Sequence, residues 1–301
     1  MADKKFLLEP VAHQQAIDFI QSKPAVTREV FDQLVPALRA RAFTVTGIES
    51  ANTLQRLRDR IADLPAGANW DDIKADIIED ISPFLVDPDA DEETRAAQEA
   101  AADARANLLL RTHGFEAYQA AAYEVMDRQR EVFPFWQYMI MDANARDTHA
   151  ALDGLILPAD SPFWADHYPP WDWGCRCQVV ALMEEEMQNV ENGDAEYGRV
   201  LSDVELQNLE ESGRLGLPNG QVINVSSPTA SGKENAFTWN PGDLRIPIED
   251  LKDRYDPDVW DTFVDFAKKT KLAEDGTQEE DGKGTHSLWT WLSEKKKVKA
   301  A

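Results

Sequence analysis

The residues best suited to chemistry lie in one segment of the 301-residue chain, between positions 142 and 180. The chain has two cysteines, Cys175 and Cys177, which flank Arg176, and His149 lies upstream of them. Two thiolates and an imidazole are ligands that zinc accepts, with His167 or an aspartate as the fourth. Zinc knuckles more often have two residues between their cysteines, so the Cys-x-Cys spacing is only a modest signal for metal.

Two other interpretations of these residues stay open. A cysteine, a histidine and an aspartate could form a nucleophilic site, although nothing in their spacing specifies one. In the third interpretation, which we favour, the segment is structural. The cysteines are then small buried hydrophobes and His149 donates to a backbone carbonyl. Ion pairs would link Arg146 and Arg176 to aspartates of the segment, namely Asp142, Asp147 or Asp153.

Composition excludes several classes of protein. A disulfide between Cys175 and Cys177 would be strained, which argues against a disulfide-stapled secreted domain. The formal net charge of −24 opposes binding to nucleic acid or anionic lipid as the main activity. The acidity is concentrated in residues 51–100 and 151–200. No apolar run is long enough for a signal peptide or a membrane span, so we expect a soluble protein of a reducing compartment.

Periodicity predicts the elements that position these residues. Apolar residues at helical spacing predict short helices over 11–20, 27–38, 52–61 and 70–81, with Pro36 and Pro83 as breaks. An alanine-rich stretch over 92–130 predicts one or two long helices, interrupted at His113-Gly114. Aromatic and β-branched runs predict strands at 135–141, 178–182 and 222–225, and residues 184–191 predict an acidic helix or turn. A last helical face spans 251–266, residues 272–285 are expected to be disordered, and 286–292 form an apolar plug.

These elements predict an α+β fold, in which an N-terminal helical region precedes a small mixed α/β module with a Pro/Trp-rich loop. We expect four regions. Residues 1–86 form the helical region and 87–133 the alanine-rich helical segment. Residues 134–245 form the module, and 246–301 form a C-terminal helix with a partly disordered tail.

The segment from 142 to 177 resembles the phage Mu F-like minor head protein family, also called phage head morphogenesis proteins. The shared pattern is D-x-x-x-R-x-x-H, an Asp-Gly, PFW and then PPxxWGCRC. The resemblance extends over about 13–245 and includes KPAVTREVFDQL near its start and TWNPGDLR at its end. The matching positions are Asp142, Arg146, His149, Gly154, Trp164, Pro169, Pro170, Trp173, Cys175, Arg176 and Cys177.

The resemblance implies a non-catalytic minor capsid protein of a tailed phage or prophage, made in the host cytoplasm and incorporated in the head interior or at the portal vertex. It would act in procapsid assembly and in DNA packaging or delivery. The implied partners are the portal protein, the major capsid protein or a scaffold protein, without a membrane. The basic residues Lys295–Lys299 leave a weak contact with packaged DNA open. A Cys/His-dependent protease or nuclease of head maturation is the alternative, and zinc is the one cofactor the residues allow.

Overall fold

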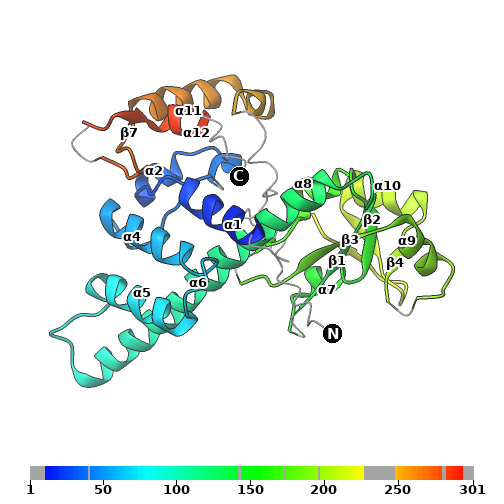
Figure 1. The fold of residues 1–301 in the computed structure, drawn as a ribbon, viewed down its shortest axis with the longest axis horizontal. Helices are drawn as coiled ribbons and strands as arrows, with labels where there is room; N and C mark the ends of the chain where they lie inside the picture. Colours follow the sequence, from blue (N-terminus) through cyan, green and yellow to red (C-terminus); the bar gives the residue numbers. More distant parts are fainter. Residues whose placement is uncertain are drawn as a thin grey trace, which may run out of the picture.

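The computed structural model describes residues 11–39, 41–141, 144–172, 174–195, 197–226, 248–279 and 283–293. Helices fill the N-terminal part and a small sheet follows them, so the α+β class is confirmed (Figure 1). The N-terminal helices are α1 (Val11–Ser22), α2 (Arg28–Asp32), α3 (Pro36–Arg39), α4 (Ala51–Ala62), α5 (Trp70–Leu85) and α6 (Glu92–Arg128).

Helix α6 runs unbroken for 37 residues, so the predicted interruption at His113-Gly114 is wrong. A Cβ at Gly114 would lie 2.8 Å from Cδ2 of Leu64, so this glycine lets the segment around Leu64 approach the helix closely. Asp91 caps the helix by accepting a hydrogen bond from the Thr94 backbone N–H at 2.8 Å. One face of α6 packs against α1, α4 and α5 through small and aliphatic residues, which include Ala102, Ala106, Leu110, Ala117 and Ala121.

Three helix boundaries differ by a few residues from the prediction. The cap of α4 is Ser50 rather than Asn52, and its side chain accepts from the Thr53 backbone N–H. Helix α5 continues past Pro83 to Leu85. Pro36 is the first residue of α3, a position where a backbone N–H has no partner within the helix, so its absence removes no hydrogen bond.

A four-stranded sheet follows α6, in the order β3-β1-β2-β4. Its strands are β1 (Phe135–Met139), β2 (Leu155–Pro158), β3 (Gln178–Leu182) and β4 (Arg199–Val200). Strand β1 is antiparallel to β2 and β3, while β4 is parallel to β2. Strand β3 has the predicted bounds, β1 is two residues shorter, and β2 was not predicted because a four-residue apolar run has no periodicity to read. The helices of this module are α7 (Asp147–Ala150), α8 (Phe163–His167), α9 (Glu184–Glu191) and α10 (Asp203–Ser212).

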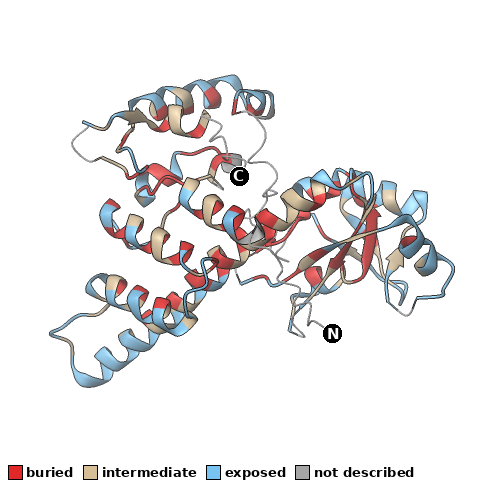
Figure 2. Ribbon diagram, in the orientation of Figure 1, coloured by how far each residue is buried: buried red, intermediate tan, exposed pale blue. Residues whose placement is uncertain are grey.

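The module has its own aromatic core. The rings of Trp136 and Trp164 are 5.6 Å apart, and Tyr168 packs edge-on against Trp136 at 6.0 Å. Tyr123 of α6 packs edge-on against Trp136 at 5.4 Å and against Tyr168 at 4.9 Å. The last turns of α6 therefore enter the core of the sheet module, while its middle belongs to the helical core (Figure 2). A hairpin, β5 (Arg214–Gly216) with β6 (Val222–Asn224), completes the module.

The C-terminal elements return to the N-terminal ones. They are η2 (Ile248–Arg254), α11 (Pro257–Lys269), β7 (Lys271–Leu272), β8 (His286–Ser287) and α12 (Leu288–Ser293). Their apolar residues form one cluster with residues 26–42. The expectation of disorder over 272–285 is wrong for 272–279, because Ala25 N donates to Gly276 O at 3.0 Å and Gln278 N donates to Ala25 O at 3.0 Å. Within the described part of the chain, no helix is long and apolar enough to cross a membrane.

A buried ion pair lies where the helical core meets this C-terminal segment. The Lys23 ammonium is 2.5 Å from Oε1 of Glu116, and His113 Nδ1 is 3.3 Å from Oε2. Arg58, also buried, donates to Lys23 O at 2.9 Å and to Asp275 O at 3.2 Å. Burial lowers the pKa of Lys23. Burial alone would raise the pKa of Glu116, but Lys23 and His113 outweigh it and lower that pKa.

Replacing Glu116 should therefore destabilise the protein strongly. Glu116→Gln leaves Lys23 in the interior without this counter-charge, and we expect the free energy of unfolding to fall by about 3–5 kcal/mol. Urea denaturation at pH 7 measures it, with the exposed Glu99→Gln of the same helix as control. Equal stability of the two variants would contradict the account.

Because the pKa of Glu116 is lowered, its contribution to the free energy of unfolding should be present above the pKa of an unfolded glutamate. This contribution should be lost as the pH falls through the pKa of Glu116 in the folded state.

Candidate functional site

His149 is held inside the module by the short helix α7. Arg146 precedes the helix, and its guanidinium is 3.1 Å from Oδ2 of Asp172, a carboxylate that is only 5% exposed. This ion pair joins the start of α7 to the loop before β3. The His149 ring faces inward, is 2% exposed and lies 5.0 Å from the ring of Trp171.

The two cysteines lie in the loop that leads into β3. The loop follows a cis Pro169-Pro170 bond and turns at Gly174, whose φ of +70° disfavours other residues. Cys175 N donates to Asp172 O at 3.0 Å, and Cys177 N donates to the Cys175 sulfur at 3.4 Å. Strand β3 begins directly after Cys177, so its pairing with β1 fixes the end of the loop.

These two elements bring one imidazole nitrogen and two sulfurs together. His149 Nδ1 lies 3.4 Å from the Cys177 sulfur and 3.6 Å from the Cys175 sulfur. All three ligand atoms lie within 4.8 Å of one another, and the three residues are buried. The cysteines are small buried residues, as the structural interpretation expects. However, His149 faces their sulfurs rather than a backbone carbonyl.

The two cysteines affect each other's ionisation. A hydrogen bond from the Cys177 thiol, together with His149, lowers the pKa of Cys175, whereas the same bond and burial raise the pKa of Cys177. Burial, and then the neighbouring thiols, raise the pKa of Tyr138 well above its usual range. Ionisation of one cysteine therefore opposes ionisation of the other.

The candidates for a fourth ligand lie elsewhere. His167 is buried, with Nδ1 3.1 Å from Phe163 O and Nε2 2.7 Å from Val225 O, so both ring nitrogens face backbone carbonyls. Asp153 Oδ1 accepts from the Ile140 backbone N–H at 2.9 Å and from the Tyr197 hydroxyl. Among the described residues, no further His, Cys, Asp or Glu joins the group of His149 and the two cysteines.

The other motif residues have structural surroundings. Gly154 has a φ of +74° and donates its N–H to Tyr138 O at 2.8 Å, which ends the turn between α7 and β2. Trp164, Pro169 and Pro170 are buried, and Arg176 is exposed. Asp142 and Trp173 lie outside the described residues, as do TWNPGDLR and the Lys295–Lys299 tail.

Sequence reasoning missed three residues of the site. Asp172, which the sequence analysis did not name, forms an ion pair with Arg146. Trp171 covers His149, and Tyr138 lies in the environment of the thiols. The alternation of large side chains along β1 could have pointed to Tyr138, since every second residue of a strand shares a face.

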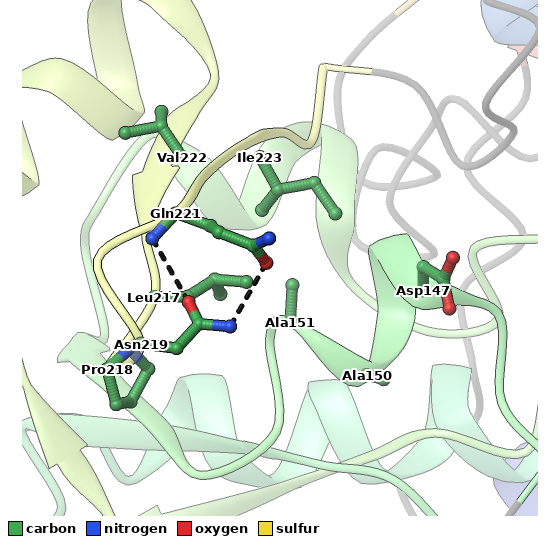
Figure 3. Close-up of a pocket in the computed structure, with 9 residues that line it drawn as sticks. All are labelled: Asp147, Ala150, Ala151, Leu217, Pro218, Asn219, Gln221, Val222 and Ile223. Carbon is green, nitrogen blue, oxygen red and sulfur yellow. Dashed lines mark hydrogen bonds between the residues drawn. The ribbon is translucent and has the colours of Figure 1, made fainter.

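A separate cavity of about 830 Å³ lies beside α7 (Figure 3). Its walls are α7 and the β5–β6 hairpin, whose turn is held by Asn219 Nδ2 donating to Gln221 Oε1 at 3.0 Å. Asp147 is its one ionisable lining residue. Neither His149 nor a cysteine lines it, so the cavity does not lead a substrate to the thiols.

Loss of Trp164 should weaken the module. Its indole N–H donates to Pro158 O at 2.9 Å. Trp164→Phe removes this bond and should lower the free energy of unfolding by about 1 kcal/mol. Trp164→Ala also empties the core and should lower it by about 3–5 kcal/mol. Chemical denaturation followed by fluorescence measures the free energy of unfolding of each variant, with the exposed Val259→Ala as control. A Trp164→Ala as stable as that control would disprove a packing role.

Comparison with known proteins agrees with the resemblance. Residues 45–180 match the family described as Phage Mu protein F like protein. Over 169 residues the chain is 33% identical to the Mu-like prophage FluMu F protein of Haemophilus influenzae, covering 54% of this chain and 40% of that protein. Over 133 residues it is 30% identical to the putative capsid assembly protein F of Escherichia phage Mu, covering 42% and 29%. The aligned region is thus less than half of either relative. No solved structure matches the chain.

Proposed function

We propose that this chain acts in phage head assembly as a non-catalytic minor head protein, because residues 45–180 match the phage Mu F-like family. The observation that carries this proposal is the match over residues 45–180, together with the name of the phage Mu relative, a capsid assembly protein. The matched residues run from the helical core through α6 to β3, so they include both packed parts that α6 joins.

The packing of the sheet module supports a role in docking. We propose that residues 134–182 form a rigid docking unit and that the N-terminal helices bind the portal, the major capsid protein or a scaffold protein. The aromatic core and the buried prolines hold the long connection before β3 in one conformation. A preorganised surface binds with a smaller loss of conformational entropy than a flexible one.

The charge favours a protein partner over DNA. The net charge is −24, and the hairpin formed by α5 and α6 carries several exposed carboxylates, among them Asp71, Asp72, Glu92, Glu93 and Glu99. DNA binding needs basic residues that face phosphates. A basic patch on a head protein fits this acidic hairpin of α5 and α6 instead.

The burial of the thiols supports the absence of catalysis. Cys175 is 7% exposed and Cys177 3% exposed, and Trp171 covers His149. A cysteine nucleophile needs a partly exposed thiolate that a substrate can reach. A protease or nuclease built on these residues would have to open the module first.

Removing the gene from the phage or prophage that encodes this chain tests the function. We expect lysates without the protein to contain coat and portal proteins but to lose most DNA-filled heads, which electron microscopy counts. Supplying the wild-type chain from a plasmid should restore them. Filled heads in normal number without the chain would refute a role in assembly.

A charge variant tests the acidic hairpin as the docking surface. Replacing Glu92, Glu93 and Glu99 by glutamine should lower the rate of association with the portal or coat protein by roughly tenfold at low salt. The matched control replaces the exposed Glu184, Glu185 and Glu191 of α9, and should bind at the wild-type rate. Surface plasmon resonance measures both. Equal rates for the two variants would exclude the hairpin as the contact.

A further inference from the structure

We propose that His149, Cys175 and Cys177 bind one zinc ion, which ties α7 to the loop before β3. This inference is independent of the proposed role in head assembly, since it concerns the construction of the module. It is carried by the geometry of three buried ligand atoms that come from two separate segments of the chain.

The distances fit a tetrahedral zinc site. Zinc bonds to sulfur at about 2.3 Å and to an imidazole nitrogen at about 2.1 Å, so a tetrahedral angle separates the nitrogen from each sulfur by about 3.6 Å. The observed separations are 3.4 Å for Cys177 and 3.6 Å for Cys175. Both nitrogen-to-sulfur distances therefore match those of a tetrahedral zinc site.

The surroundings are those of a bound thiolate. The backbone N–H of Cys177 is directed at the Cys175 sulfur from 3.4 Å, and such hydrogen bonds help to orient and stabilise a thiolate ligand. Cys175 N donates to Asp172 O, and Asp172 is held by Arg146, so the loop has a fixed position relative to α7. The ligands are thus oriented by the same contacts that hold the loop.

The donor set selects the metal. Two thiolates and an imidazole favour zinc over magnesium or calcium, which prefer oxygen ligands. A Cys₂His set leaves the fourth corner of the tetrahedron to a water molecule, a coordination that zinc also adopts in proteins. His167 does not supply this corner, because both its nitrogens face carbonyl oxygens.

Metal analysis of the full chain tests the site. Protein purified without chelator should hold about one zinc per chain by mass spectrometry under native conditions. Cys175→Ser/Cys177→Ser and His149→Asn should lose it, while His286→Asn, a histidine outside the group, should retain it. Zinc X-ray absorption should give two sulfur neighbours at about 2.3 Å and two nitrogen or oxygen neighbours at about 2.0–2.1 Å.

Cobalt substitution keeps the proposal testable if the variants do not fold. Wild-type protein loaded with Co²⁺ should show thiolate-to-cobalt charge-transfer bands and the intense visible bands of tetrahedral cobalt, and a chelator should lower its melting temperature. A folded wild-type chain that purifies without metal and takes up neither zinc nor cobalt would overturn the proposal. So would an absorption spectrum without sulfur neighbours.

Discussion

The unbroken helix α6 is the constraint on which the rest of the structure depends. Its middle supplies the alanine and leucine face of the helical core, and its last turns carry Tyr123 and Met126 into the aromatic core of the sheet module. Because both cores pack against the same helix, neither core can change its packing on α6 without affecting the helix. Gly114 lies in the middle of this helix, where glycine lowers helix stability. Its missing side chain leaves the space into which Leu64 packs.

The sheet module uses this support to hold an irregular segment in place. The described residues between 159 and 177 contain one short helix, so their conformation depends on side chains more than on backbone pairing. Trp164 and Tyr168 anchor the segment in the core, and the Arg146–Asp172 ion pair and the contact of His149 with the two cysteines hold its end. The described residues of the motif between 146 and 177 therefore mainly fix this segment. A zinc ion at its end would act in the same way.

Local pattern was sufficient to predict much of this. The strand at 178–182 has the expected bounds, the segment 184–191, expected to be a helix or a turn, is a helix, and one of the three interpretations of the motif grouped His149 with the cysteines from residue type alone. The failures involve partners that are distant in the sequence. The sequence predicted a helix break at Gly114, because Leu64, whose side chain packs against this glycine, is fifty positions away. The sequence predicted disorder over residues 272–279, because their composition does not indicate the backbone hydrogen bonds with Ala25. Asp172 was missed as the partner of Arg146 for the same reason.

The central claim is that this packed chain is a component of the phage head, and quantitative mass spectrometry of purified heads tests it most directly. Heads separated from free protein by density-gradient centrifugation should contain the chain at a fixed ratio to the portal protein, in preparations from independent lysates. A chain that stays in the soluble fraction while the heads assemble and fill without it would contradict the account.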